Sequence, residues 1–288
     1  MVRKLEKIVP YIFILPFTLS FLAFFLFPAV YSFVLSFFQY KGYGTATFVG
    51  LDNYTRLLTY RTFWQYLANT VFYFFAHFVP VMILSFLLAL AVRSELIRQS
   101  QKVYKPIIFL PQMTASVAAA LIFRIIFGGE AGVINQMIGI HIPFLTDLDL
   151  IRWPVVVLII WRATGWYFVI YLAGLTTIDD DLIAAAKIDG TTAVQRVIHV
   201  VIPIMKPIFM FAFVMNAIGS LKIYNEPNLM MNNIGNTPTQ AAPYMNTVVD
   251  NLQGGYFGTA SAAGWLLFVV ILLVTMFQFS LFRRGGDQ

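Results

Sequence analysis

Six long apolar stretches constrain the fold of this chain more than any other feature. They cover residues 10–38, 67–92, 106–127, 153–176, 204–223 and 257–282. A helix needs about 20 apolar residues to cross the hydrocarbon core of a bilayer, and each stretch is that long. Lipid offers backbone groups no hydrogen-bond partners, so only helices and closed barrels can cross it. Runs such as Val155–Ile160 lack the alternation of a barrel strand. The sequence therefore predicts an all-α integral membrane protein with six transmembrane helices.

Composition and charge agree with this prediction. Hydrophobic residues fill 59% of the 288 positions and charged residues only 11%, whereas a soluble domain carries roughly 25% charged residues. Twelve Lys and Arg residues fall on the side of the membrane that holds both termini, and five fall on the other side. Because basic loops are retained inside the cell, we expect both termini to be cytoplasmic. The net charge of +6 is explained by this anchoring and needs no nucleic-acid partner.

The N-terminus resembles a secretory signal only at first sight. Basic residues precede an apolar run, but the run is far longer than the roughly 7–15 residues of a cleavable signal. We therefore expect a retained first helix with its outer loop (1–66), a transmembrane core (67–282) and a cytoplasmic tail (283–288). Cysteine is absent, which excludes disulfides and thiolate metal sites.

A polar segment between the fourth and fifth stretches, residues 179–203, is here called the elbow. Its leading aspartates (179–181) are suited to capping a helix N-terminus. Gly190 suits the left-handed residue that ends a helix, and Thr192 with Gln195 fits a capping box that starts the next one. The elbow is therefore predicted to be a helix, a glycine turn and a second helix on the cytoplasmic face.

The second helix of the elbow should present one apolar stripe, because residues three and four positions apart share a helix face. The stripe consists of Val194, Val197, Ile198 and Val201. Spacing alone leaves two interpretations open. The elbow either docks onto another protein or lies as an ordinary amphipathic segment on lipid headgroups.

The elbow resembles the EAA loop of ABC importer permeases. That loop reads approximately Glu-Ala-Ala, three residues, Gly, and later Ile-x-Leu-Pro; the matching residues here are Ala185, Ala186, Asp189, Gly190, Val200, Ile202 and Pro203. Four further segments are similar to sugar permeases of this kind: Phe48–Tyr54, Phe109–Pro111, Leu172–Leu175 and Gly264–Arg284. The resemblance covers nearly the whole chain and points to the carbohydrate-uptake family that includes maltose, glycerol-phosphate and multiple-sugar permeases.

The resemblance implies a type I importer permease fold with no catalytic residues of its own. It implies an ATPase-coupling site at Asp181, Ala184, Ala185, Ala186, Asp189, Gly190 and Pro203. The implied partners are a second homologous permease, two ATP-binding subunits, an extracytoplasmic solute-binding protein and the lipid of a bacterial or archaeal cytoplasmic membrane. The chain has no Gly-x-x-x-x-Gly-Lys-Ser/Thr phosphate loop. ATP and Mg²⁺ are therefore expected on partner subunits, and no cofactor is expected on this chain.

Two positions depart from the family's pattern. The glutamate of the motif is Ala184 here, and the proline common near the loop start is Asp179. In the family that glutamate helps to fix the loop to the ATPase. We therefore hypothesise that Asp180, Asp181 or Asp189 supplies the missing charge.

Candidate substrate contacts come from the fourth and fifth stretches, because sugars bind through hydrogen bonds and aromatic platforms. These candidates are Trp166, Tyr167 and Tyr171 on the fourth stretch and Asn216 and Tyr224 on the fifth. Asn216 could equally pair with another helix, since a buried amide in lipid needs a partner. Arg162 is an ionisable group within the membrane, which is costly. It is either a substrate contact or, as we favour, a structural charge paired with carbonyls or with the partner subunit.

Other classes of function are weighed against this one. An ion-coupled secondary transporter would need carboxylates inside the membrane, and none of the thirteen acidic residues falls within the six stretches. An enzyme is not expected, because the chain has neither His-Glu-x-x-His nor Gly-x-Ser-x-Gly, and His77, His141 and His199 lack metal-ligand spacing. A permease for an anionic substrate, such as glycerol phosphate or acidic polysaccharide fragments, would give Arg162 a larger role.

Overall fold

The computed structural model of the chain describes residues 2–94, 101–129, 132–231 and 237–284. The described residues form helices and one two-stranded sheet. They divide into two compact units: Met1–Phe63 with Thr247–Phe268, and Trp64–Asn246 with Val269–Gln288. Most of the predicted cytoplasmic tail lies outside the described residues.

The first unit begins with a long apolar helical stretch. It comprises α1 (Val2–Phe21), a π-helical turn η1 (Leu22–Leu26) and α2 (Phe27–Leu35), followed by the antiparallel strands β1 (Phe38–Gln39) and β2 (Thr47–Phe48) and by α3 (Asp52–Thr59). From residue 10 to residue 28 the side chains of this stretch are exposed. An apolar surface of this extent needs cover from lipid or from another protein.

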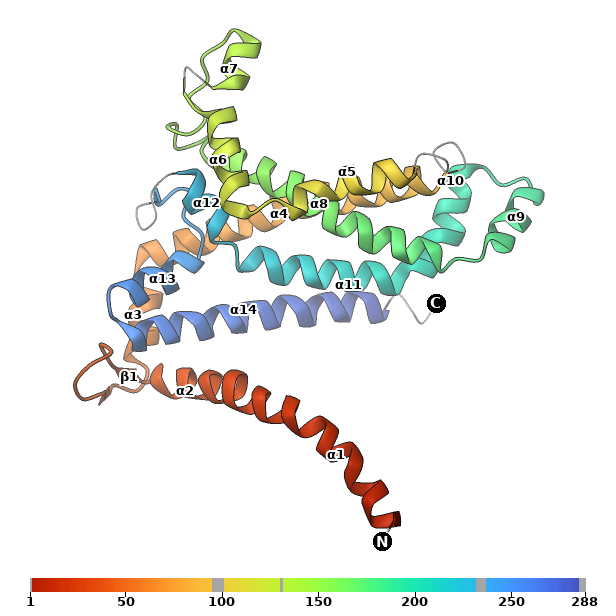
Figure 1. Cartoon of the computed structure of the whole chain (residues 1–288). Coiled ribbons are helices and arrows are strands. Elements are labelled where there is room, and N and C mark those ends of the chain that lie inside the picture. Colours follow the sequence, from red (N-terminus) through yellow and green to blue (C-terminus); the bar gives the residue numbers. More distant parts are fainter. Residues whose placement is uncertain (1, 95–100, 130–131, 232–236, 285–288) are drawn as a thin grey trace. The chain divides into compact units, whose positions relative to one another are not determined.

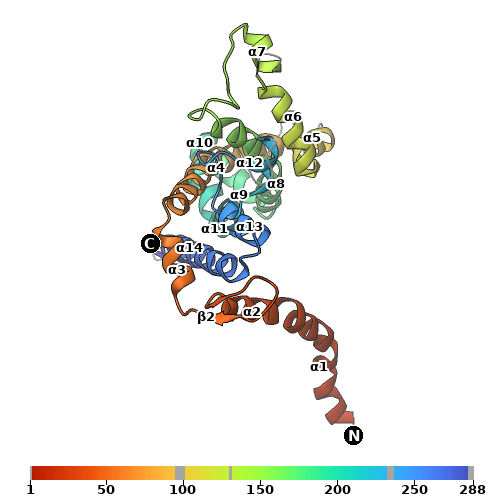
Figure 2. The same cartoon turned by 90° about the vertical axis from the view of Figure 1, so that its left-hand side faces the viewer.

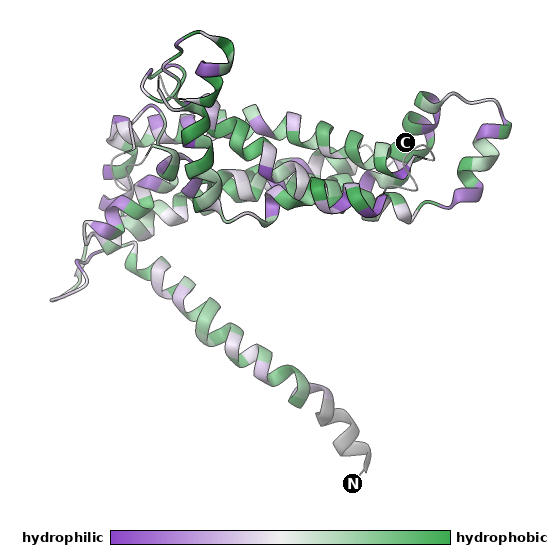
Figure 3. Cartoon of the chain, turned by 45° about the horizontal axis from the view of Figure 1, so that its top comes forward, coloured by the Kyte–Doolittle hydropathy of each residue, from purple (hydrophilic) through white to green (hydrophobic). Residues whose placement is uncertain are grey.

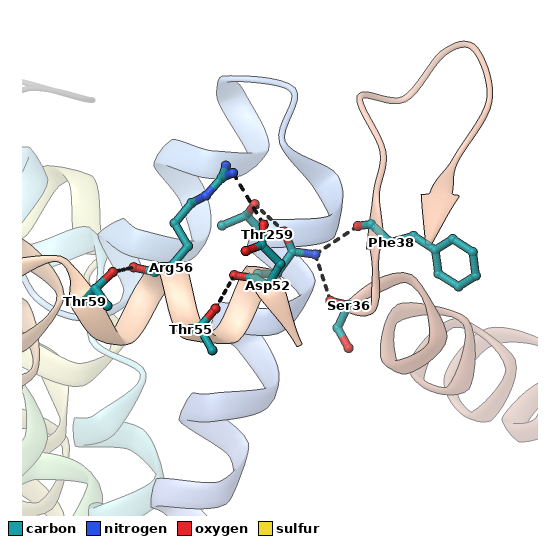
Figure 4. Close-up of polar contacts among 8 residues, drawn as sticks. Ser36, Phe38, Asp52, Thr55, Arg56, Thr59 and Thr259 are labelled. Atoms are coloured by element: carbon teal, nitrogen blue, oxygen red, sulfur yellow. Dashed lines mark hydrogen bonds and ion pairs between the residues drawn. The ribbon is translucent and has the colours of Figure 1, made fainter. Parts of the chain in front are cut away.

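A buried asparagine organises the loop that follows the first helix. The Asn53 amide donates hydrogen bonds to the carbonyls of Ser36 (2.9 Å) and Phe38 (3.0 Å). Its carbonyl oxygen accepts a hydrogen bond from the Thr259 hydroxyl (3.1 Å), and Figure 4 shows the positions of Ser36, Phe38 and Thr259. This residue belongs to the Phe48–Tyr54 segment, so that segment joins the end of α2 to the start of α14 (Phe257–Arg284) within the first unit.

The second unit is a helical bundle in which α8 (Arg152–Thr176) packs on its neighbours. Two buried clusters line this helix, and they include residues of α4 (Arg61–Arg93), α6 (Ser116–Phe127) and α11 (Ile202–Leu221). Figures 1 and 2 both show α4, α8 and α11 side by side. The remaining elements are α5 (Gln101–Met113), α7 (Val133–Ile138), α9 (Asp180–Ile188), α10 (Ala193–Arg196), the π-helical turn η3 (Val197–Val201), α12 (Asn225–Met230) and α13 (Met245–Gln253), whose last residues belong to the first unit.

Two glycines of α8 let its neighbours approach closely, as small residues do in membrane bundles. A Cβ at Gly165 would lie 2.5 Å from the carbonyl oxygen of Ile108 on α5. A Cβ at Gly174 would lie 2.4 Å from Cδ1 of Ile208 on α11. The glycines therefore set the spacing of α5 and α11 around α8.

Five of the six predicted spans are single helices long and apolar enough to cross a membrane, counting α1–η1–α2 and α10–η3–α11 as continuous. Figure 3 shows that the helices of the second unit are hydrophobic along most of their length. The sixth, over 106–127, is a bent pair, because α5 and α6 meet at an angle of 92°. The break lies at Thr114 and Ala115, and the φ of −55° and ψ of 135° at Ala115 are not helical.

The described residues between α11 and α13 pack against the second unit. The side chains of Ala241, Ala242 and Tyr244 are fully buried. The Asn69 amide on α4 donates to the carbonyls of Thr239 (2.8 Å) and Ala242 (2.9 Å). Small apolar residues and backbone carbonyls thus attach this loop to the N-terminal part of α4.

Candidate functional site

The elbow has the helix–turn–helix structure that its sequence predicts. The Asp179 carboxylate accepts a hydrogen bond from the Asp181 N–H (3.0 Å) and caps α9. Gly190 has a left-handed backbone, with φ of +76°. Thr192 and Gln195 form both halves of the capping box, at 2.8 and 3.3 Å, and start α10. The prediction of a capped helix, a glycine turn and a second capped helix is therefore confirmed.

Further hydrogen bonds close the turn of the elbow upon itself. The Thr191 hydroxyl donates to the Ala186 carbonyl (2.5 Å), and the Arg196 guanidinium donates to the Thr191 carbonyl. At the base, the Arg93 guanidinium donates to the Ile178 carbonyl (2.9 Å) and to the Asp180 carboxylate (3.0 Å). The elbow therefore holds its shape through its own contacts and one attachment to α4.

The outer surface of the elbow carries apolar side chains that this chain does not cover. Ile188 is 86% exposed and Val194 is 67% exposed. The predicted sites Asp181, Ala184, Ala185, Asp189, Gly190 and Pro203 are exposed, and Ala186 is half-buried. Figure 3 shows hydrophilic residues beside hydrophobic ones on this element. An exposed surface of this mixed character, on a segment that is rigid by itself, is suited to docking onto another molecule.

The four residues of the predicted apolar stripe differ in burial. Val201 is buried and Val197 half-buried, whereas Val194 and Ile198 are exposed. The π-helical turn η3 directly follows α10 and contains three of the four. Only the end of the elbow therefore packs into the bundle.

A cavity of about 240 Å³ lies in the second unit, towards the end of α11 that is far from the elbow. It is lined by residues of α4, α8, α11 and the start of α12: His77, Ile159, Ala163, Tyr167, Asn216, Gly219, Ser220, Lys222, Ile223, Tyr224, Asn225 and Glu226. The lining combines apolar side chains with convergent amide, hydroxyl and imidazole groups, which is the usual make-up of a small-molecule site.

A buried polar network fixes one wall of this cavity. Nε2 of His77 lies 2.8 Å from the Ser220 hydroxyl, which lies 3.0 Å from Oδ1 of Asn216. The other ring nitrogen of His77 faces the Tyr73 carbonyl, so Nδ1 carries the proton and Nε2 is an acceptor. The single Ser220 proton is shared among Nε2 of His77 and the two oxygens of Asn216. The network joins α4 to α11 and orients the Asn216 amide at the cavity.

The structure brings some of the predicted substrate contacts together and separates others. Asn216, Tyr167 and Tyr224 line the cavity. Tyr224 does not lie on the fifth span as predicted, because α11 ends at Leu221. Trp166 is 44% exposed and does not line the cavity. Tyr171 is fully buried, with its hydroxyl 3.1 Å from the Met82 sulfur.

Sequence reasoning did not assign His77, Ser220 or Glu226 to a site. Ser220 carried a usable signal, since it lies four residues after Asn216 and therefore on the same face of α11. The contact between His77 and Ser220 joins residues 143 positions apart, so no local sequence pattern predicts it.

Arg162 makes contacts with two other elements of the second unit. Its Nη1 lies 2.7 Å from Oε1 of Glu226 on α12, and its Nη2 donates to the Thr114 carbonyl (3.4 Å) at the break between α5 and α6. A helix break leaves carbonyls without helical partners, and this guanidinium supplies one. From the sequence we favoured carbonyls or a second subunit as partners of Arg162; in the structure the partners are a carbonyl and a carboxylate of the same chain.

Known proteins are similar in sequence to this chain over nearly its whole length. Residues 82–285 match the family described as "Binding-protein-dependent transport system inner membrane component". The arabinooligosaccharides transport system permease protein AraP of Bacillus subtilis (strain 168) is 31% identical, over 96% of this chain and 89% of that protein. The lactose transport system permease protein LacF of Rhizobium radiobacter is 31% identical, over 92% and 90%.

A solved structure has the same fold. It is a bacterial alginate ABC transporter in complex with an alginate pentasaccharide-bound periplasmic protein, and one of its chains matches with a TM-score of 0.85 and 23% identity, over 100% of this chain and 99% of that chain. The fold is thus that of an ABC importer permease. With a family match over more than two thirds of its length, this chain belongs to the binding-protein-dependent transport system inner membrane components.

Proposed function

We propose that this chain is a permease subunit of an ABC importer that moves a sugar or oligosaccharide across the cytoplasmic membrane of a bacterium or archaeon. The observation that carries the proposal is the elbow: a self-supporting, exposed helix–turn–helix at one end of α11, with a polar cavity at the other end. The names of the relatives AraP and LacF support a carbohydrate substrate.

ATP hydrolysis on separate subunits would drive transport through the elbow. The exposed side chains of Ile188 and Val194 offer an apolar contact for an ATP-binding subunit. Asp181 and Asp189, both exposed, are better placed than Asp180 to replace the charge lost at Ala184, because Asp180 contacts Arg93. ATP and Mg²⁺ would bind on those subunits, and a second homologous permease would complete the membrane part.

The direction of transport follows from the expected orientation. Both termini and the elbow would face the cytoplasm, and the cavity would lie towards the outer face, where an extracytoplasmic binding protein delivers the substrate. Asn216 lies fourteen residues beyond Ile202 on α11, which is roughly 21 Å at 1.5 Å per residue. A displacement of the elbow would therefore reach the cavity along a single helix.

Neutral hydrogen-bonding groups in the cavity support a sugar as the substrate. The Asn216 amide and the Ser220 hydroxyl can exchange hydrogen bonds with sugar hydroxyls, and the Tyr167 ring offers an apolar face. A cavity of about 240 Å³ holds one or two sugar rings at a time. An oligosaccharide would then be held at one end.

Reconstitution of the complete complex in proteoliposomes tests the proposal. Uptake of a labelled oligosaccharide should require ATP inside and the binding protein outside. Ile188→Asp should abolish both association with the ATP-binding subunits and uptake, because it places a charge in an apolar contact. Ile140→Asp is the matched control, since Ile140 is 61% exposed in a loop outside the elbow. Uptake that runs on an ion gradient without ATP would refute the proposal.

A further inference from the structure

One charged pair beside the cavity has no part in the function proposed so far. Glu226, near the start of α12, lines the cavity. Its Oε1 lies 2.7 Å from Nη1 of Arg162, and the two side chains are only 20% and 17% exposed. Arg162 does not line the cavity, but its neighbour Ala163 does. The guanidinium therefore lies directly behind a carboxylate that faces the cavity.

We propose that this pair makes the cavity select uncharged glycans over acidic ones, an inference that rests on the proposed function. A guanidinium is the side chain best suited to hold the carboxylate of an acidic sugar. Here the Arg162 guanidinium is engaged by Glu226 and by the Thr114 carbonyl. Glu226 is the member of the pair that lines the cavity, so an acidic sugar would approach the negative end of the pair and find the guanidinium already occupied.

The other described lining residues do not reverse this preference. Tyr167, Asn216 and Ser220 supply neutral donors and acceptors. Lys222 brings a positive charge, but it is exposed. A lysine ammonium in water is strongly hydrated, and salt screens its field. The less exposed pair of Arg162 and Glu226 is therefore expected to have the larger effect on an anion bound in the cavity.

The fold by itself does not determine whether a transporter prefers neutral or acidic glycans. The solved chain of the same fold belongs to a transporter of alginate, an acidic polysaccharide. Selection between neutral and acidic glycans must therefore depend on individual side chains, and in this chain Glu226 lines the cavity while its counter-ion Arg162 does not.

The test measures binding to the complete transport complex in lipid nanodiscs without the binding protein, so that only the membrane subunits choose. Two panels of probes are compared by saturation-transfer NMR: maltotriose, arabinotriose and lactose as neutral probes, and trigalacturonate and an alginate trisaccharide as acidic probes. For the wild type we expect neutral probes to bind severalfold better than acidic ones; the effect is smaller than that of an isolated charge, because the Arg162 guanidinium lies 2.7 Å from the Glu226 carboxylate.

Two variants separate the roles of the charges. Glu226→Gln should expose the guanidinium of Arg162 and shift the ratio at least about tenfold towards the acidic probes. The double variant Arg162→Gln with Glu226→Gln should lose that shift, because the cation is gone. Asp149→Asn is the control, since it removes a carboxylate outside the cavity lining and should leave the ratio unchanged.

The outcomes are distinct. A wild type that prefers acidic probes, or a Glu226→Gln variant with the wild-type ratio, overturns this inference while ATP-driven sugar uptake still stands. A wild type that binds no probe of either panel and takes up no sugar with ATP overturns the proposed function, and this inference with it. Size-exclusion profiles of the purified complexes show whether each variant is assembled.

Discussion

Gly190 offers the sharpest test of the elbow as a docking element. Its φ is +76°, and no atom lies within 4 Å of the position where a Cβ would be added. Gly190→Ala therefore creates no clash, and its effect comes from the left-handed backbone alone, which costs alanine about 1–2 kcal/mol. That energy corresponds to a ~5–30-fold lower population of the native turn at most.

The lower population should appear directly as weaker docking. A partner that binds only the native elbow has its apparent affinity reduced by the fraction of elbows in that state. The bonds that oppose the change are those that close the turn: Gly190 N–H to the Lys187 carbonyl (3.1 Å), Thr191 N–H to the Ala186 carbonyl (3.2 Å), and the contacts of the Thr191 hydroxyl and carbonyl. Gly190→Asn should weaken docking less, because asparagine tolerates this backbone, and Gly190→Pro more, because proline fixes φ near −65°.

The assay is sugar transported per ATP hydrolysed in proteoliposomes, together with the affinity of the purified ATP-binding subunits for the membrane subunits. Gly264→Ala is the control, because this helical glycine of α14 also has no atom within 4 Å of an added Cβ. We expect the control to match the wild type, followed in decreasing order by Gly190→Asn, Gly190→Ala and Gly190→Pro. Equal affinity and coupling for Gly190→Ala and the wild type would refute the claim that the left-handed turn sets the docking geometry.

Three further predictions concern stability, measured by thermal unfolding in detergent. Gly165→Ala places a Cβ 2.5 Å from the Ile108 carbonyl and should cost about 1–3 kcal/mol; an unfolding midpoint equal to that of Gly264→Ala would contradict the tight α5–α8 contact. Asn53→Ala leaves the Ser36 and Phe38 carbonyls without this partner and should cost about 1–3 kcal/mol, visible as faster proteolysis of the loop after α2. Burial raises the pKa of Asp250, so the folded state binds the carboxyl proton more tightly than the unfolded state does. The folded protein therefore loses stability at this residue as the pH rises above the usual carboxyl range. Asp250→Asn should therefore raise the unfolding midpoint at neutral pH and leave it unchanged at acidic pH. An equal rise at both pH values would show that the charge on Asp250 does not destabilise the folded state.

The elbow could be predicted from sequence because its determinants are local. Asp179, Gly190 and the pair of Thr192 with Gln195 act within three or four residues of their partners. Capping and left-handed turns depend on the identity of a few neighbouring side chains. The structure of the elbow therefore follows from a short segment read by itself.

The cavity could be predicted only in part, because its contacts join distant elements. Asn216 was a candidate, since a lone amide in an apolar span needs a partner. Its network with His77, however, requires α4 and α11 to be neighbours, and the pairing of Arg162 with Glu226 joins residues 64 positions apart. The 92° bend between α5 and α6 was missed for a related reason. Hydrophobicity reports the length of a span, and it does not report whether the helix is straight.

The contacts of α11 explain how a displacement of the elbow can reach the cavity. The helix is held near its start, where Gly174 of α8 admits Ile208 to close contact, and near its end, where Ser220 meets His77. Close-packed contacts of this kind transmit displacement instead of absorbing it. The less regular part is η3, a π-helical turn between α10 and α11, and such turns recur at functional sites. We therefore expect the elbow to change its angle at η3 while α11 and α8 move together, so that the cavity changes shape mainly against α4 and α12, the elements that carry His77 and Glu226.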